Sequence, residues 1–300
     1  MIFIDLHIKT IRKGGIMEFK KEELLKNPFN YQGGKFKLLP QILPLFPNNI
    51  ETFYDLFCGS GEVGINVNSK KLVLNDYNSE FLKMFKNITM ENIECEFDTI
   101  INNYGLSKIN KDGYLKLRED YNKTKDNKML YMLLCHSFNN QISFNKNREF
   151  NVPFGMNKSS FNDSLRLKYR KYVEVIKSKN ILFSDNSFLD FDINMIDNND
   201  FVYIDCPYLI TVGGYERDYK LKWSEELETK LLNLLDNINY IGIKFALSNV
   251  LEHKGKSNNI LKEWSKKYNI HYLNHNYGNC NYQTKDKSKN STIEVLITNY

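Results

Sequence analysis

The feature that most constrains the fold is a regular alternation of short apolar segments with longer helical patterns. Buried strands are predicted over residues 51–57, 71–76, 181–185, 201–205 and 243–249. Helical periodicity lies between them, for example over 35–46, 78–88 and 225–237. Because strands that alternate with helices form a mostly parallel sheet covered on both faces, the sequence predicts an α/β fold.

Two other parts of the chain depart from this alternation. The last apolar runs, "IHYLNH" and "IEVLITN", flank a polar, turn-rich stretch and are predicted to form an antiparallel pair that closes the sheet. The middle of the chain has helical patterns followed by the irregular "FNNQISFNKNREFNVPFGMNKSSFN". We therefore expect an N-terminal extension over 1–26, one domain assembled from 27–89 and 179–300, and an inserted, mainly helical domain over 90–178 with an exposed loop or hairpin.

Composition narrows the class of protein. The hydrophobic fraction of 42% argues against a disordered chain, and a net charge of +5 is a mild indication of a polyanionic partner. The five cysteines and five histidines lack metal-ligand spacing, so we expect reduced thiols and no metal. No signal peptide and no membrane-spanning stretch are evident, which favours a cytoplasmic protein without a membrane partner.

Acidic residues and glycines follow the predicted strands, at the edge where open α/β sheets bind ligands. In "DLFCGSGEVG", Asp55 ends a strand, and Gly59 and Gly61 form a turn that lets the backbone approach a ligand. An ordinary strand-to-helix turn is the alternative. Asp76 ends the next strand about twenty residues on, where an acid can bind the two hydroxyls of a ribose. Since the three-glycine dinucleotide fingerprint is incomplete, a nucleoside without pyrophosphate fits better than NAD.

A carboxylate followed by a cysteine, a proline and an aromatic ring ends the strand in "FVYIDCPYLI". Pro207 stiffens the turn after Asp205, so Tyr208 is expected to stand out from the sheet edge. An aromatic face beside a carboxylate suits a planar base that carries an amino group. The alternative is that Asp205 only caps a helix or forms a turn.

A Gly-Gly turn in "NPFNYQGGKFKLLPQILPLFP" comes just before a predicted amphipathic helix. Lys35 follows Gly33 and Gly34, and an anionic group is expected at the N-terminus of that helix. A plain junction between a loop and a helix is the alternative.

Taken together, "YQGGK", "DLFCGSG", "NDYN" and "DCPY", in this order, resemble the Dam-type, D12 class of DNA adenine-N6 methyltransferases. The resemblance extends from about Asn27 to Tyr300. It is most detailed for the Dam methylases of T-even bacteriophages, through "YLITV", "GIKFALSNVLEHKGK", "LKEWSKKYN" and "LREDYNKT". The resemblance implies a Rossmann-like methyltransferase fold with an inserted target-recognition domain. It also implies methyl transfer from S-adenosyl-L-methionine to N6 of a flipped adenine in double-stranded DNA, in a bacterial cell or a phage-infected host.

The same resemblance implies roles for individual residues. The target base is expected to be held by Asp205, Cys206, Pro207 and Tyr208. The cofactor is expected to contact Tyr31, Gly34, Lys35, Asp55, Phe57, Gly59, Gly61, Asp76, Asp185, Phe188 and Asp205. Within this set, Tyr31 and Lys35 border the methionine end, and Asp185 and Phe188 flank the adenine. DNA contacts are expected from Asn140, Ser143, Asn145, Arg148, Asn151, Pro153 and Asn157, and phosphate contacts from Lys146, Lys158 and Arg166.

The chemistry explains why an acid ends this strand. The N6 amine of adenine is a poor nucleophile, so two acceptors, the Asp205 carboxylate and the backbone carbonyl of Cys206, are expected to draw it toward tetrahedral geometry. Cys206 replaces the first proline of the usual Asp-Pro-Pro-Tyr, and a main-chain oxygen tolerates that change. A nucleophilic cysteine, as in C5-cytosine methyltransferases, is the alternative, although those enzymes place it in another sequence context.

The target site and the competing activities stay open. Ser143 stands where the phage relatives have an arginine, the commonest reader of guanine, so the target is expected at GATC or a related short site without being fixed. Related chemistry methylates N4 of cytosine, RNA bases or a protein glutamine. A catalytically weak or inactive DNA-binding relative would fit Cys206 and Ser143. A monomer in solution or a weak dimer on DNA is expected, either within a restriction-modification system or alone.

Overall fold

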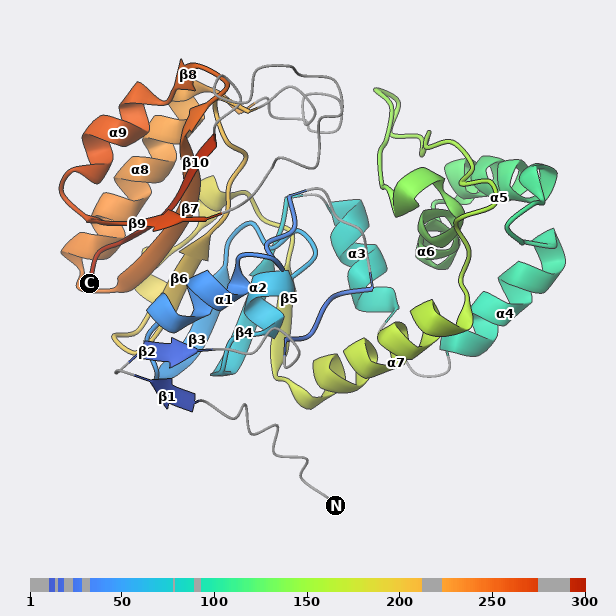
Figure 1. Ribbon diagram of the computed structural model, residues 1–300, viewed down its shortest axis with the longest axis horizontal. Helices are drawn as coiled ribbons and strands as arrows, with labels where there is room; N and C mark the ends of the chain where they lie inside the picture. Colours follow the sequence, from blue (N-terminus) through green and yellow to red (C-terminus); the bar gives the residue numbers. More distant parts are fainter. Residues whose placement is uncertain are drawn as a thin grey trace.

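The computed structural model describes residues 11–13, 16–18, 24–28, 33–77, 79–88, 93–211, 223–274 and 292–300. Its centre is an eight-stranded sheet in the order β5-β4-β3-β6-β7-β10-β9, with β8 paired to β7 (Figure 1). The strands are β3 (Ile50–Asp55), β4 (Ser69–Asn75), β5 (Ile181–Ser184), β6 (Phe201–Ile204), β7 (Lys244–His253), β8 (Lys256–Ser257), β9 (Asn269–Leu273) and β10 (Thr292–Thr298). A separate antiparallel pair joins β1 (Ile11–Lys13) to β2 (Ile16–Glu18).

The strand directions confirm the predicted α/β fold. Strands β5, β4, β3, β6 and β7 run parallel to one another. Strand β10 is antiparallel to both β7 and β9, so the two last strands close the sheet as expected. The result is a mostly parallel, Rossmann-like sheet whose parallel strands end at one common edge.

The two faces of the sheet are covered by different helices, because successive side chains of a strand point to opposite faces. On one face, Phe53 and Tyr203 belong to a buried core that also receives α1 (Leu39–Ile42), α2 (Glu62–Ile65) and α3 (Ser79–Asn87). On the other face, Val202 and Ile204 pack with α8 (Glu225–Tyr240) and α9 (Asn259–Ser265). Side chains that alternate along one strand thus fill two separate cores.

The helix predicted over 35–46 is wrong in length. Residues 36–38 form a turn, α1 has only four residues, and the 3-10 helix η2 (Leu43–Leu45) follows it. Pro44 has no N–H to donate, and a proline ring collides with the carbonyl of the preceding turn, so an α-helix cannot continue through it. The long helix at whose N-terminus an anionic group was expected is therefore not formed, and the anion site itself stays a prediction.

The middle of the chain is mainly helical. It contains α4 (Ile93–Tyr104), α5 (Lys111–Thr124), α6 (Asn127–His136), the 3-10 turn η3 (Phe138–Asn140) and α7 (Asp163–Ser178). Side-chain oxygens of Asn110, Asp126 and Asn162 cap the first turns of α5, α6 and α7. Figure 1 shows α4, α5 and α6 away from the sheet, with α7 leading back to β5.

A short hairpin lies between η3 and α7. An isolated bridge joins Phe144 to Phe150, and both rings are buried. Asn122 of α5 binds this hairpin through two hydrogen bonds. Its Nδ2 donates to Phe150 O at 3.1 Å, and its Oδ1 accepts from Phe150 N at 2.7 Å. The exposed turn of the hairpin is thereby held on a helical base.

Two short 3-10 turns, η4 (Phe188–Asp190) and η5 (Ile193–Met195), connect β5 to β6. Among the helices that the structure describes, none combines the length and apolar character required to cross a membrane.

Candidate active site

Three carboxylates meet at the edge where the parallel strands end. Asp55 is the last residue of β3, and Asp76 and Asp205 follow β4 and β6. The parallel register places Asp55 opposite Leu74 and Tyr203, so the ends of these strands coincide. Burial, reinforced by the negative charges of Asp205 and Asp76, raises the pKa of Asp55 well above its ordinary value. The acidic side chains at this edge are suited to a cationic or hydroxyl-rich ligand.

The glycine turn after β3 depends on glycine for two reasons. Gly59 and Gly61 have φ values of 48° and 68°, in the left-handed region that favours glycine. A Cβ atom on Gly61 would lie 2.8 Å from Cε1 of Phe85. The amide of Gly59 donates to Oδ2 of Asp76 at 2.8 Å, so this acid also fixes the turn.

Asp55 has an orphaned oxygen. Its side chain is 1% exposed, and its Oδ1 atom has no hydrogen-bond partner among the described residues. A buried carboxylate oxygen without a donor destabilises the folded chain by about 1–3 kcal/mol. A ligand that brings a cationic donor into this edge would satisfy that oxygen.

Three aromatic rings form a cluster beside these acids. The Phe57 and Phe188 ring centroids are 5.5 Å apart, and Trp223 lies 5.8 Å from Phe57 and 5.6 Å from Phe188. Asp185, just after β5, is exposed. Trp223 was missed by the sequence analysis, because it is distant in sequence from the strand-end motifs. The cluster offers an apolar surface for a flat ring.

Asn75 joins the loops on either side of the cluster. Its Nδ2 donates to Leu56 O at 2.9 Å and to Asn186 O at 3.1 Å. Its Oδ1 accepts from the amide of Asn186 at 3.1 Å. The loops after β3 and β5 are thus tied together by one side chain at the end of β4.

Asp205 is bound on both oxygens. Lys35 Nζ lies 2.9 Å from Oδ2, and the Tyr208 hydroxyl donates to Oδ1 at 2.9 Å. Burial raises the pKa of Asp205, and the charge and hydrogen bond of Lys35 and the hydroxyl of Tyr208 counter that rise. Burial also disfavours the charge of Lys35, but Asp205 and Glu294 outweigh it, so the Lys35 pKa is raised. Lys35 is therefore a cation that opposes the rise in the Asp205 pKa.

Tyr208 differs from the expectation that it stands out from the sheet edge. Its ring is half-buried and its hydroxyl turns inward to Asp205. Glu294 Oε1 also lies 3.2 Å from this hydroxyl. Glu294, on β10, was missed as a site residue, although an acid inside the apolar run "IEVLITN" was a usable signal because unpaired acids are rarely buried.

Cys206 is 2% exposed, with the Nδ2 atom of Asn249 at 3.7 Å from its Sγ. Burial, together with the carboxylates of Glu228 and Asp205, raises the pKa of its thiol well above the ordinary value. Since the thiolate is the nucleophilic form, this environment argues against a nucleophilic role. It favours a tolerated substitution in the turn.

A buried polar network supports the loop that carries Cys206. Glu228 is 0% exposed and accepts from Trp223 Nε1 at 2.6 Å, Asn258 Nδ2 at 2.9 Å and Asn249 Nδ2 at 3.2 Å. The network joins the aromatic cluster, through Trp223, to the side chain beneath Cys206. Sequence reasoning missed it because an acid in the first turn of a helix is expected to face solvent near the helix dipole.

The Gly-Gly turn is joined to Asp205 by the ion pair of Lys35, the residue that follows the turn. Gly33 has a φ of 86°, Gly34 is exposed, and Lys35 is 6% exposed. Tyr31, expected beside the cofactor, lies outside the described residues. Pro207 is half-buried in the turn after Asp205.

The residues predicted to contact DNA bases or phosphates differ in their exposure. Asn140 and Asn145 use their side chains inside the protein, through Cys135 O at 2.9 Å and Glu149 Oε2 at 2.7 Å. Ser143 is half-buried. The exposed members are Lys146, Arg148, Asn151, Pro153, Asn157 and Lys158.

Arg166, for which a phosphate contact is expected, is engaged within the protein. Its guanidinium forms ion pairs with Glu94 and Asp98, and its side chain is 19% exposed. It also lies over the ring of Phe161, at 4.6 Å from the centroid. Arg166 therefore joins α7 to α4, and its contact with phosphate stays a prediction.

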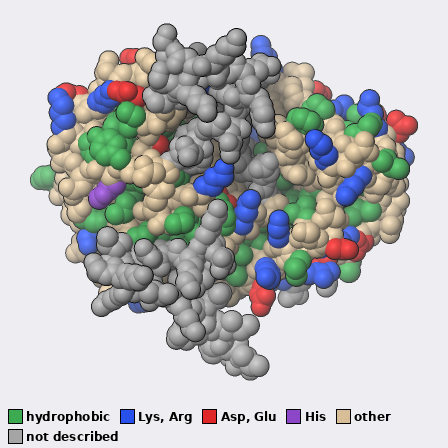
Figure 2. All heavy atoms as spheres, viewed as in Figure 1, with side chains coloured by type: hydrophobic (Ala, Val, Ile, Leu, Met, Phe, Trp, Pro, Cys, Tyr) green, Lys and Arg blue, Asp and Glu red, His purple; other side chains and the backbone are tan. Residues whose placement is uncertain are grey.

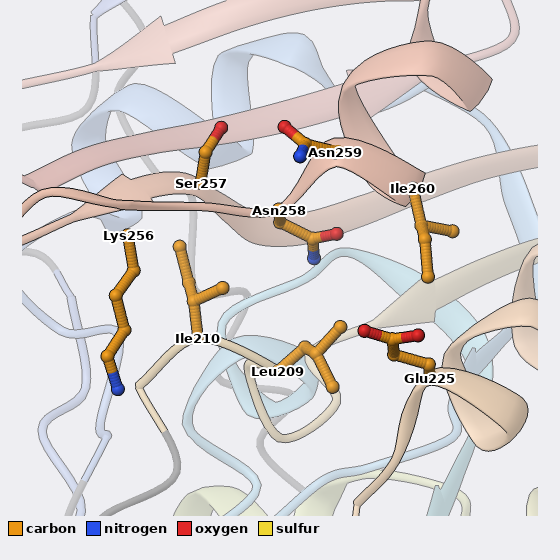
Figure 3. Close-up of a pocket in the computed structure, with 8 residues that line it drawn as sticks. All are labelled: Leu209, Ile210, Glu225, Lys256, Ser257, Asn258, Asn259 and Ile260. Carbon is orange, nitrogen blue, oxygen red and sulfur yellow. The ribbon is translucent and has the colours of Figure 1, made fainter.

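A pocket of about 290 Å³ lies beside the loop that follows Tyr208. Figure 3 shows Leu209 and Ile210 of this loop, with residues from the start of α8, from β8 and from the start of α9 around them. Among the described residues, no three His, Cys, Asp or Glu side chains are grouped as metal ligands.

Comparison with known proteins agrees with this geometry. Residues 31–279 match the family described as D12 class N6 adenine-specific DNA methyltransferase. The chain is 46% identical over 299 residues to the type II methyltransferase M.FokI of Planomicrobium okeanokoites, covering 98% of the chain and 46% of that protein. It is 43% identical over 302 residues to the modification methylase StsI of Streptococcus sanguinis, covering 97% and 46%.

A more distant relative is similar over most of its length. The DNA adenine methylase of Escherichia coli strain K12 is 24% identical over 252 residues, which cover 81% of the chain and 85% of that protein. By contrast, the chain spans about half the length of M.FokI and StsI. The particular similarity to phage methylases stays a prediction.

Proposed function

The chain belongs to the D12 class of N6 adenine-specific DNA methyltransferases, and we propose that it methylates N6 of an adenine flipped out of double-stranded DNA, with S-adenosyl-L-methionine as the methyl donor. The observation that carries this proposal is the position of Asp205. It follows β6 beside Asp55 and Asp76, where a nucleoside-like cofactor would fit, and Lys35 favours its ionised form.

The residues at the strand ends fit S-adenosyl-L-methionine. The orphaned Oδ1 of Asp55 would accept from its amino group, and Asp76 would accept from the ribose hydroxyls. The glycine turn lets the backbone approach it, and Phe57, Phe188 and Trp223 would flank its adenine. When bound, this cofactor supplies a methyl group activated by the sulfonium charge. Tyr31 and Asp185 retain their expected places at the two ends of the cofactor as part of the proposal.

Asp205 and Cys206 would act on the target amine. The Asp205 carboxylate accepts from one N–H of N6, and the main-chain carbonyl of Cys206 accepts from the other. Two acceptors draw the nitrogen toward tetrahedral geometry and aim its lone pair, so positioning and electrostatics supply most of the rate. Asp205 then accepts the proton that leaves N6 before it passes to water. Pro207 holds the turn, and Tyr208 would stack on the flipped base.

Lys35 takes a place that differs from the one expected for it. The resemblance assigns it to the methionine end of the cofactor, whereas its Nζ contacts Asp205 and lies 5.1 Å from the Tyr208 ring centroid. We therefore assign Lys35 to the base side of the site. There it would favour the ionised form of Asp205, which accepts from the N6 amine of the target adenine.

The DNA would cross the face shown in Figure 2, where Lys and Arg side chains spread over the middle of the molecule. The hairpin over 144–150 and its exposed Arg148 would reach the base edges, and Lys146 and Lys158 would contact phosphates. The target would be GATC or a related short site, and Ser143 puts GATC itself in doubt because the arginine expected to read a guanine is absent.

The test is methyl transfer by the purified chain. Labelled S-adenosyl-L-methionine and genomic DNA would be incubated with wild type and with Asp205→Ala, and the nucleosides analysed by mass spectrometry. We expect N6-methyladenine with wild type and none above background with Asp205→Ala, while calorimetry shows cofactor binding within about three-fold of wild type. Label in another base, or near-normal turnover by Asp205→Ala, would overturn the proposal. Single-molecule sequencing of the product gives the target site.

A further inference from the structure

Glu294 lies close to Lys35 and Tyr208, the two residues that bind Asp205. Its carboxylate is on β10 and is 2% exposed. Its Oε1 lies 3.2 Å from the Tyr208 hydroxyl and 3.7 Å from Lys35 Nζ. Both donors to Asp205 are therefore also within reach of a second, buried carboxylate.

An irregularity in the sheet accounts for this position. The pairing of β10 with β7 shifts between Ile293, which faces Glu252, and Glu294, which faces Val250. A β-bulge of this kind re-aims a side chain and is common beside active sites. The shift occurs at the end of β7 that adjoins the carboxyl ends of the other parallel strands. It places an acid of the last strand next to the loop after β6.

The Asp205 carboxylate is already engaged by two donors, and Glu294 offers one of them, Tyr208, a second acceptor. Both Asp205 oxygens are already bound, one by Lys35 and one by Tyr208. Each oxygen can accept a second hydrogen bond, but an Oδ1 that no longer binds Tyr208 is fully available to the amino group of a target base. A tyrosine hydroxyl has a single proton, so it donates to Asp205 or to Glu294 and not to both at once. A buried acceptor beside Tyr208 lets the hydroxyl leave Asp205 without losing its hydrogen bond.

We propose that Glu294 is a positioning residue for methyl transfer: it receives the Tyr208 hydroxyl and shares Lys35, and so frees Asp205 for the amino group of the target adenine. The inference rests on the function proposed above. It assigns Glu294 no contact with the base or the cofactor. It predicts an effect on the methyl-transfer step and not on cofactor affinity.

The charges around Glu294 give the inference a second readout. The titratable groups of the described elements that face it are Lys35, Asp205, Tyr208 and Tyr203. Its strand partners on β7 and β9, Val250 and Leu273, are apolar. Glu294 adds to the burial that raises the pKa of Asp205. Glu294→Gln should therefore move the acid limb of the pH–rate profile to lower pH.

The experiment compares Glu294→Gln with Glu294→Asp, which keeps the charge but shortens its reach. Glu51→Gln is the matched control, since it removes a carboxylate at the opposite end of β3. Single-turnover methyl transfer should fall about ten-fold or more in Glu294→Gln and less in Glu294→Asp. S-adenosyl-L-methionine affinity should stay within about two-fold in all three, and Glu51→Gln should match wild type.

A double-mutant cycle tests whether Glu294 acts through Tyr208. In a Tyr208→Phe background there is no hydroxyl to receive, so Glu294→Gln should cost less than about a third of its fold effect in wild type. An equal effect in both backgrounds would overturn the inference. A wild-type rate and an unshifted pH profile in Glu294→Gln would do the same.

Folding and activity controls separate the remaining outcomes. If Glu294→Gln does not fold, Glu294→Asp decides: slow transfer with normal cofactor affinity supports the inference, and a normal rate overturns it. Equal losses of cofactor affinity and rate would indicate a general structural role and also overturn it. A wild-type chain that binds cofactor and methylates no DNA would instead overturn the proposed function itself.

Discussion

The Nζ atom of Lys35 lies 2.9 Å from Oδ2 of Asp205, and this ion pair joins the Gly-Gly loop to the loop after β6. Both side chains are largely buried, at 7% and 18% exposure. Solvent therefore screens the pair weakly, and each group controls the ionisation of the other. The ionised form of the carboxyl group that follows β6 is thus favoured by a residue from a distant part of the sequence.

Replacing Lys35 should change the pH dependence of methylation. The pKa of Asp205 is raised by burial and held down by Lys35, so Lys35→Met should raise it further. Because the acid acts as a carboxylate, activity falls as the pH drops through this pKa. The acid limb of the single-turnover profile should therefore move to higher pH, and the neutral rate should fall about ten-fold or more. Lys37→Met, at an exposed neighbour, is the control, and an identical profile in the two variants would contradict the assignment.

Asp76 should control the affinity for S-adenosyl-L-methionine. Truncation in Asp76→Ala would leave the ribose hydroxyls unpaired and weaken binding about ten-fold or more, on the scale of hydrogen bonds to a charged group. Asp76→Asn should lose less, because its side-chain oxygen can still accept from Gly59 N. Titration calorimetry measures both, with Asp112→Ala on the exposed side of α5 as the control. Unchanged affinity in Asp76→Ala would remove this residue from the cofactor site.

We expect the Asp55 carboxylate to lower the free energy of unfolding and to strengthen cofactor binding. Its folded pKa is raised well above the ordinary value of 3.8, so between these two pKa values the unfolded chain has lost a proton that the folded chain retains. The free energy of unfolding therefore falls as the pH rises through this window. Asp55→Asn has no such proton to lose, and at neutral pH it should be more stable than wild type by about 1 kcal/mol.

The stability gain of Asp55→Asn should disappear below about pH 4, where Asp55 is protonated in both states. Chemical denaturation of both proteins across pH gives the difference. The variant should also bind S-adenosyl-L-methionine about ten-fold more weakly, since a charge-assisted hydrogen bond is lost. A pH-independent stability difference would show that the carboxylate charge is not its source.

Cys206 should be dispensable as a thiol. If its main-chain carbonyl is the second acceptor, Cys206→Pro restores the usual turn and should methylate at least as fast as wild type. Cys206→Ser should stay within about ten-fold, a barrier change of about 1.4 kcal/mol. Small thiol reagents should inactivate wild type little, because burial keeps the thiol protonated. Two inactive variants that fold and bind cofactor would show that the side chain has a chemical role.

Local patterns in the sequence were sufficient to predict the mostly parallel sheet and the acidic residues at its edge. Strand and helix periodicities are read within a few turns of chain, and their alternation indicates parallel strands. Parallel strands end at a common edge, so Asp55, Asp76 and Asp205 were expected along that edge, and the order β4-β3-β6 makes their three strands neighbours. The helix over 35–46 failed for an equally local reason, since Pro44 was visible in the sequence and its effect on the periodicity was not applied.

Only the tertiary structure decided which side chains surround these acids. Lys35 reaches Asp205 because a loop folds over the sheet edge, and Glu294 joins them through a shift in register between β7 and β10. Glu228 lies in a helix whose charge pattern predicts exposure, yet packing against Trp223 and Asn249 buries it completely. Periodicity specifies the face on which a residue lies, whereas these contacts depend on register and on packing between distant segments. That physical difference is why the sequence by itself determined the acids and only the folded chain determined their partners.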